Sequence, residues 1–169
     1  ERIQFNSILG FTIQRDKTND LFRPSEGFIH TATIQESGLL PLLLKNAQPN
    51  LPFTQFYSLT LQGRWYFDLT DRRFSIFALK LKAGYENKYG ESSLDDSRTI
   101  PPAYRFYAGG GGSVRGWKSR DLSATGDPLF GGNVAMEGSA ELRMKIMKSL
   151  SDDFLDKIWL VTFIDFGNV

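Results

Sequence analysis

Apolar and polar residues alternate with a period of two over long stretches of this chain. In the stretch VAMEGSAELRMKI (134–146), Met136 and Leu142 fall on one face, whereas Glu137 and Glu141 fall on the other. Successive side chains of a β-strand point to opposite faces, so this alternation predicts strands with one apolar and one polar face. No other feature of the sequence restricts the possible folds as strongly.

Six stretches of the chain are expected to form strands. They lie at about 2–16, 27–37, 57–69, 73–88, 134–146 and 157–169. These strands are roughly twice as long as the typical strand of a globular sheet, which has about 5–6 residues. A strand that crosses a membrane needs about 9–11 residues. The sequence therefore predicts an all-β fold, an antiparallel up-and-down transmembrane β-barrel, of which this chain supplies about six strands.

The connections between these stretches alternate in length. The shorter ones lie at about 16–26, 69–73 and 148–156, and the longer ones at about 38–55 and 89–133. In an up-and-down arrangement, the shorter connections fall at one end of the strands and the longer ones at the other. Outer-membrane barrels have short periplasmic turns and longer extracellular loops. The loop lengths therefore support the barrel interpretation.

Composition excludes several classes of function. The formal charge is +1, with 20 basic and 19 acidic residues, so no general attraction to nucleic acid is expected. There is no cysteine and only one histidine, His30, which we interpret as a strand residue. We accordingly expect no metal site and no cofactor. No apolar run approaches the roughly 20 residues of a membrane helix.

The glycine run in GGGGSVRGWKS (109–119) does not fit a phosphate-binding loop. Such a loop needs a lysine directly after its last glycine and a helix behind it, but here Trp117 precedes Lys118. The following residues, SRDLSATGDPLFGGN, contain further glycines and a proline, so no helix is expected there. Nucleotide binding is therefore excluded as the role of this run.

The sequence does not indicate an enzyme. Glu137 and Glu141 lie on one face of an expected strand but about 13 Å apart, too far to act on the same bond. Arg143 and Lys145 share that face, which is typical of the solvated inner wall of a wide barrel. No Ser-His-Asp arrangement can be assembled around His30.

Several motifs, in this order, resemble the C-terminal barrel of the BamA/TamA superfamily, also called the bacterial surface antigen family. They are GGGGSVRGW, then GGN, then a strand with S-x-E at Ser139 and Glu141, then a strand ending in FIDFGNV. The family has a V/I-R-G-F/Y tip on its sixth extracellular loop. The corresponding residues here are Val114, Arg115, Gly116 and Trp117, the last differing in identity but remaining aromatic. Asp165 and Gly167 match a D-x-G of a following strand, and RPSEG (23–27) is similar to a turn of the family.

The resemblance covers nearly the whole chain and implies its place in a longer protein. The six strands would be the eighth to thirteenth of sixteen, so residues 1–169 would form one partial domain. The periplasmic POTRA domains, the first strands and the last strands would lie outside it. The resemblance further implies a bacterial outer-membrane location and the insertion or translocation of polypeptides there. Expected partners are outer-membrane lipid, unfolded outer-membrane or secreted client polypeptides, and accessory assembly lipoproteins.

Within this resemblance, Arg115 is expected to lock the long loop inside the barrel. If the loop at 89–133 folds inward, the guanidinium needs carboxylates, and Asp165 and Glu141 on the wall are the candidates, next to Gly167. We expect the loop glycines to let the backbone turn sharply and lie close against the wall without Cβ clashes, and we expect Arg115 and Trp117 to fix where the loop lies.

Strict alternation raises a difficulty for Asp165. It places this carboxylate on the same face as the apolar Val161 and Phe163. Either that part of the strand is packed beneath the loop, or a bulge shifts its register.

Two other functions stay open from the sequence. The barrel could be a passive porin-like channel, or it could anchor a larger surface protein such as a fused hydrolase. The full-length sequence separates these possibilities, because POTRA repeats favour assembly and a catalytic domain favours an anchor.

The outward face of the isolated chain would be apolar in every case. Its residues include Phe5, Leu9, Leu59, Leu61, Trp65, Met136 and Leu142. We therefore expect the isolated chain to self-associate in water.

Overall fold

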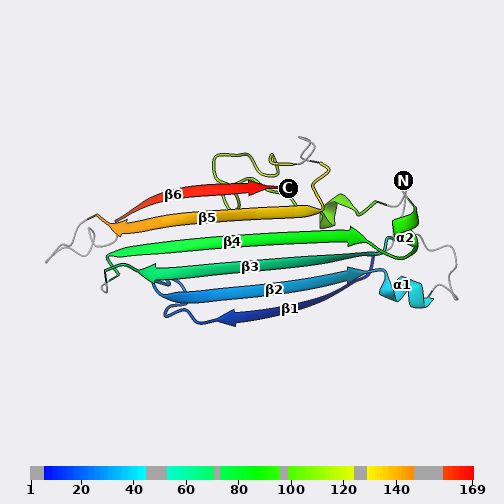
Figure 1. The fold of residues 1–169 in the computed structure, drawn as a ribbon, viewed down its shortest axis with the longest axis horizontal. Coiled ribbons are helices and arrows are strands. Elements are labelled where there is room, and N and C mark those ends of the chain that lie inside the picture. Colours follow the sequence, from blue (N-terminus) through cyan, green and yellow to red (C-terminus); the bar gives the residue numbers. More distant parts are fainter. Residues whose placement is uncertain (1–5, 45–52, 71–72, 96–98, 124–128, 147–157) are drawn as a thin grey trace.

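Six long strands form one antiparallel sheet in the order in which they occur along the chain (Figure 1). The computed structural model describes residues 6–44, 53–70, 73–95, 99–123, 129–146 and 158–169. The strands are β1 (Ile8–Asp16), β2 (Gly27–Ser37), β3 (Phe56–Asp68), β4 (Ser75–Lys88), β5 (Val134–Lys145) and β6 (Trp159–Asn168). The prediction of six antiparallel, up-and-down strands is confirmed. Residues 1–5, part of the first predicted strand, lie outside the described residues.

Among the described residues, each strand pairs with its neighbours in the sequence, and the residue pairs follow one another without a bulge. Between β5 and β6 it runs residue by residue from Met136 opposite Asn168 to Lys145 opposite Trp159. Within the described residues, β1 and β6 each keep one edge without a neighbouring strand. The sheet is therefore open, as expected for one part of a barrel wall.

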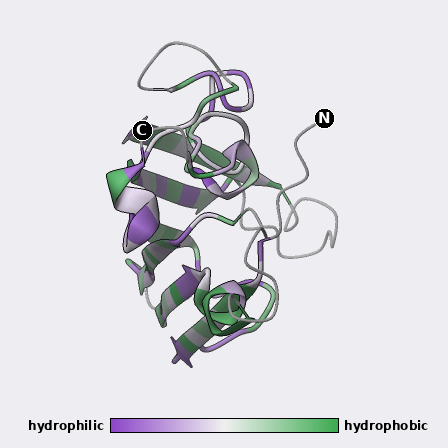
Figure 2. Cartoon of the chain, turned by 90° about the vertical axis from the view of Figure 1, so that its right-hand side faces the viewer, coloured by the Kyte–Doolittle hydropathy of each residue, from purple (hydrophilic) through white to green (hydrophobic). Residues whose placement is uncertain are grey.

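The two faces of the sheet differ sharply in polarity. Figure 2 views the sheet from the end with the long connections and shows hydrophilic and hydrophobic bands alternating along the strands. We call the face that carries Ser139 and Asp165 the inner face, and the face that carries Met136 and Ile164 the outer face. The outer face exposes large apolar side chains, Ile164 among them at 75%. Such a continuous apolar surface is typical of a wall that contacts lipid.

The connections segregate by length, as the sequence predicts. The strand ends that the β1–β2, β3–β4 and β5–β6 connections join lie at one end of the sheet, on the left of Figure 1. The strand ends that the longer connections join lie at the other end, and the described parts of these connections contain three short helices. These are α1 (Leu39–Leu44), α2 (Glu91–Leu94) and the 3₁₀ turn η1 (Pro102–Tyr104). Within the described residues, neither α-helix is long and apolar enough to span a bilayer.

The β4–β5 connection folds back over the inner face. In Figure 1 its yellow-green part runs beside β5 and β6. The ring of Phe106 lies directly over Gly84 of β4, within 2.5 Å of where a Cβ would be. A small buried core forms between this connection and the sheet, and it contains Phe56, Ile100, Ala108 and Val114. The inward-folding loop predicted from the sequence is thus present, and it brings the glycine run to the wall.

Candidate functional site

The tip of the folded-back loop is a compact turn at residues 109–117. Gly109, Gly110 and Gly116 have φ values of 104°, 96° and 93°, which L-residues with a side chain rarely adopt. The amide of Gly110 donates to the carbonyl oxygen of Trp117 at 3.1 Å, and that of Ser113 donates to Gly110 at 3.0 Å. These bonds close the turn on itself and direct the side chain of Arg115 toward β5 and β6.

The close approach between loop and wall depends on a glycine of the wall. A Cβ on Gly111 or Gly112 would meet nothing within 4 Å, and one on Gly109 would meet the loop's own Lys118 carbonyl. In contrast, a Cβ on Gly167 of β6 would lie 2.7 Å from Cγ2 of Val114. The expectation that the loop glycines allow contact with the wall is therefore wrong in this respect. They shape the turn, and Gly167 provides the space.

Arg115 forms a bidentate ion pair with Asp165 of β6. Its Nε donates to Oδ2 at 2.7 Å and its Nη2 donates to Oδ1 at 2.7 Å. The backbone N–H of Arg115 adds a third bond to Oδ2 at 2.9 Å. The side chain of Asp165 is 3% exposed and that of Arg115 is 26% exposed. These bonds to Asp165 raise the pKa of Arg115 above its ordinary value, so the guanidinium stays charged.

A second carboxylate and a hydroxyl group complete the surroundings of Arg115. Nη1 lies 2.7 Å from Oε1 of Glu141, and Nη2 donates to Oγ of Ser139 at 2.8 Å. Both residues are on β5, where the register places Ser139 directly opposite Asp165. The other oxygen of Glu141 accepts bonds from Arg143, at 2.9 Å from Nε and 2.6 Å from Nη2. Two arginines and two carboxylates therefore form one network in which the charges balance.

The ring of Phe163 lies beneath the guanidinium. The Cζ atom of Arg115 is 3.5 Å from the ring centroid, close enough for a cation–π interaction. Phe163 is opposite Glu141 in the unbroken register of β5 and β6. The shared face of Asp165 and Phe163 therefore results from packing beneath the loop and not from a bulge.

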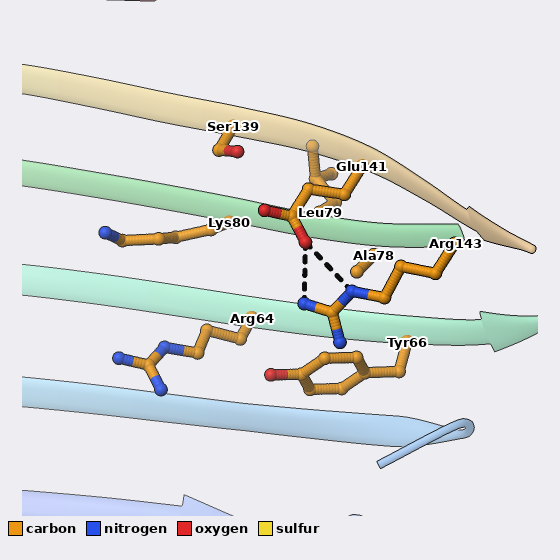
Figure 3. Close-up of a pocket in the computed structure, with 8 residues that line it drawn as sticks. All are labelled: Arg64, Tyr66, Ala78, Leu79, Lys80, Ser139, Glu141 and Arg143. Atoms are coloured by element: carbon orange, nitrogen blue, oxygen red, sulfur yellow. Dashed lines mark hydrogen bonds and ion pairs between the residues drawn. The ribbon is translucent and has the colours of Figure 1, made fainter. Parts of the chain in front are cut away.

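Two lysines of β4 bind the residues on either side of them, one bonding to the loop tip and the other to β5. Lys80 donates from Nζ to the carbonyl oxygen of Gly112 at 2.7 Å, and Lys82 lies 3.2 Å from Oε1 of Glu137. Lys80 also lines a cavity of about 170 Å³, most of whose lining residues belong to the inner face. Figure 3 shows Arg64 and Lys80 from adjacent strands on one side of it, with the bonded pair Glu141 and Arg143 on the other. The inner wall here is charged and polar.

The structure brings together most of the residues that the sequence singles out. Val114, Arg115 and Gly116 form the loop tip, and Asp165, Glu141 and Gly167 lie against it. Trp117 differs, because the residue is 52% exposed and its carbonyl oxygen accepts a hydrogen bond from Gly110 of the same loop. The expectation that Trp117 fixes the loop on the wall therefore finds no support in these contacts.

Sequence reasoning missed the roles of Phe163 and Lys80. The position of Phe163 on the polar face was a signal that something covers that strand. Lys80 gave no comparable signal, because a lysine on a solvated inner wall is unremarkable. Glu137 and Glu141 belong to separate ion pairs, with Lys82 and with Arg115 and Arg143. Across the part of the chain that the structure describes, no three potential metal-ligating side chains cluster.

Comparison with known proteins identifies relatives of this fold. The family profile described as "Omp85 superfamily domain" matches residues 1–169. The outer membrane protein assembly factor BamA of Neisseria meningitidis serogroup B (strain ATCC BAA-335 / MC58) is 32% identical over 138 residues. That match covers 76% of this chain and 15% of BamA. The chain therefore spans a small part of this relative's length.

The fold resembles that of a solved BamA structure. The crystal structure of BamA from Haemophilus ducreyi lacking POTRA domains 1–3 superposes with a TM-score of 0.72 at 18% sequence identity. The superposition covers 95% of this chain and 29% of that one. The resemblance to this group that the sequence motifs indicate is confirmed, as is the bacterial outer membrane as the location. A family profile that matches from the first residue to the last shows that this chain belongs to the Omp85 superfamily.

Proposed function

We propose that this chain is part of the β-barrel of a factor that inserts or translocates polypeptides at the outer membrane, and that Arg115 locks its lumenal loop. The observation that carries this proposal is the set of three hydrogen bonds from Arg115 to Asp165. One of these bonds comes from the backbone, so the carboxylate fixes both the side chain and the course of the loop at the tip. An arginine that only neutralised a wall charge would not need this backbone contact.

Three further contacts support a single position for the tip. Val114 fills the space above Gly167, Lys80 bonds the carbonyl of Gly112, and Phe163 lies under the guanidinium. They come from β4 and β6, on either side of β5. Together with Ser139 and Glu141 of β5, they hold the loop from three strands, which resists both lifting and sliding along the wall. We infer that the lock couples these strands and stiffens this part of the barrel.

The proposed activity follows from family membership and the character of the two faces. The relative from Neisseria meningitidis is named an outer membrane protein assembly factor. Here the outer face is suited to lipid and the inner face is charged, as a barrel wall requires. We propose that the clients are unfolded outer-membrane or secreted polypeptides and that accessory assembly lipoproteins act with the full-length protein. Residues 1–169 would be one part of the C-terminal barrel, with POTRA domains and further strands outside this chain. The proposed role is not enzymatic.

Reconstitution of the full-length protein tests this proposal. Proteoliposomes that contain it should accelerate the folding of an unfolded outer-membrane β-barrel client, and Arg115→Ala should reduce that acceleration strongly. Arg120→Ala is the matched control, because Arg120 lies in the same loop but stacks on the loop's own Tyr107. Equal activity of Arg115→Ala and wild type would refute the lock. No acceleration by wild type would refute the assembly role.

The charged inner wall also supports a second function, a passive channel. Arg64, Lys80 and Arg143 line the inner-face cavity with Glu141 as its one carboxylate, and this excess of positive charge would favour anions. Planar-bilayer conductance of the same protein separates the two functions. A steady, anion-selective current without client folding would favour the channel.

A further inference from the structure

Four side chains form a connected group on the outer face, near the end with the short turns. They are Arg15, Phe28, His30 and Trp65, and we call them the outward cluster. The register of β1–β2 places Arg15 opposite His30, and that of β2–β3 places Phe28 opposite Trp65. The group therefore spans three adjacent strands.

Each member of the outward cluster contacts the next, in the order Arg15, Phe28, His30 and Trp65. Cζ of Arg15 is 5.4 Å from the centroid of the Phe28 ring. The Phe28 and His30 rings stack at 4.5 Å, and His30 meets Trp65 edge-on at 5.3 Å. Trp65 is itself held in place, since its ring covers Gly63 of the same strand. Arg15 therefore lies over the first ring of a contiguous aromatic group that runs from Phe28 through His30 to Trp65.

The charge of Arg15 is unusual on this face. The outward residues that precede it on β1 are Leu9, Phe11 and Ile13, all more than 60% exposed. Within the described residues, Arg15 is exposed and belongs to none of the ion pairs found. A cation on a lipid-facing wall is costly unless it lies at headgroup level near an anion. In a bilayer, that anion is a lipid phosphate, and the attraction is greatest for an anionic lipid, whose headgroup has no ammonium group to offset the phosphate.

The position of the outward cluster along the wall indicates which leaflet it meets. Arg15 is the next-to-last residue of β1, directly before the short β1–β2 connection. Short turns of outer-membrane barrels face the periplasm, and aromatic residues gather at the membrane interface. The cluster therefore lies at the periplasmic interface, where the lipids are phospholipids.

We propose that the outward cluster binds the headgroup of an anionic phospholipid in the periplasmic leaflet. The guanidinium of Arg15 meets the phosphodiester with paired N–H donors, which match two phosphate oxygens. His30, on the neighbouring strand β2, offers a ring nitrogen for a further hydrogen bond to the headgroup. Phe28 and Trp65 provide apolar contacts for the glycerol part of the lipid. This site lies on the other side of the wall from Arg115 and does not depend on the proposed lock.

Native mass spectrometry of the full-length protein tests the site. The protein is released from detergent micelles containing equal amounts of phosphatidylglycerol and phosphatidylethanolamine at a low lipid ratio. Wild type should retain phosphatidylglycerol preferentially, and Arg15→Gln should lower the fraction carrying it about fivefold, the loss expected for one surface cation. Arg15→Lys keeps the charge and should retain most of the lipid.

Arg64→Gln is the control, because it removes an arginine from the inner face and should leave lipid retention unchanged. Equal retention of both lipids by wild type would overturn the proposal, and so would unchanged phosphatidylglycerol on Arg15→Gln. Preferential retention of lipopolysaccharide over phosphatidylglycerol, measured in a third arm, would also overturn it, because the cluster would then meet the outer leaflet.

Discussion

Cγ2 of Val114 lies 2.7 Å from the point where a Cβ of Gly167 would stand. The loop tip and β6 are thus in contact at the one place on that strand where the wall has no side chain. The φ angle of Gly167 lies outside the left-handed region, so the backbone conformation at this position is one that alanine can adopt. The glycine is required for the space above it.

The first prediction concerns this space. Gly167→Ala should push Val114 off the wall and lower barrel stability by about 1–3 kcal/mol, the usual cost of overpacking. Heat-dependent gel mobility of the full-length protein measures the change. Val114→Ala should restore part of the loss when combined with Gly167→Ala. Gly111→Ala is the control and should be neutral, because nothing lies within 4 Å of its Cβ. Equal effects of Gly167→Ala and Gly111→Ala would contradict the contact.

The second prediction concerns the ion pair of the lock. Arg115→Ala and Asp165→Ala should each destabilise the barrel by up to about 3–5 kcal/mol. Arg115→Ala leaves the buried Asp165 without its cation, and Asp165→Ala leaves Arg115 with Glu141 as its one remaining carboxylate among the described residues. The double variant should be little worse than either single variant, with a coupling energy of about 1–3 kcal/mol. Arg115→Lys should rescue only in part, because lysine lacks the planar fork. Additive effects in a double-mutant cycle of heat stability would show that the two groups act independently.

The third prediction concerns the ring beneath the guanidinium. Phe163→Leu keeps an apolar side chain but removes the π face, and it should cost about 0.5–2 kcal/mol. The same substitution introduced together with Arg115→Ala should cost much less, because the cation is already gone. Thermal unfolding of the four proteins provides the comparison. If Phe163→Leu lowers stability by the same amount with and without Arg115, the loss comes from packing alone and the cation–π interaction is refuted.

The fourth prediction concerns Glu86 on the inner face of β4. This residue is 1% exposed, and neither of its carboxylate oxygens has a hydrogen-bond partner among the described residues. Glu86→Met should therefore stabilise the barrel by about 1–3 kcal/mol, the penalty of an unsatisfied buried polar group. Glu137→Met is the matched control with the opposite sign, because Glu137 is also buried but pairs with Lys82. Melting temperatures that fall for both variants would indicate that Glu86 has a partner elsewhere in the full-length protein.

The fifth prediction concerns residues 1–169 as an isolated polypeptide. Its outer face is apolar, and both edge strands have unpaired backbone groups in the described sheet. Such surfaces and edges promote association in water. Sedimentation velocity in detergent-free buffer should show oligomers or aggregates that detergent reduces. A stable monomer without detergent would contradict the assignment of the outer face to lipid.

The strands and their faces could be predicted because both depend on local geometry. Residues two apart in a strand share a face wherever the strand lies, so the pattern in 134–146 predicts the outer position of Met136 and the inner position of Glu141. The segregation of short and long connections follows from the same up-and-down order. The helix α2 at Glu91–Leu94 was not predicted, since one helical turn within a long loop leaves no periodic signal.

The arrangement of the site depended on the tertiary structure. Asp165 is 50 residues from Arg115, and only the path of the loop and the pairing of β5 with β6 decide that both Asp165 and Glu141 reach the guanidinium. The sequence showed that the glycine run had to turn, but not which glycines needed positive φ. It also did not reveal that the essential space lies at Gly167. Alternation is a property of one strand and can be read from its residues. Contact between a loop and a wall depends on how segments far apart in the sequence are brought together by the fold, and no single segment contains that information.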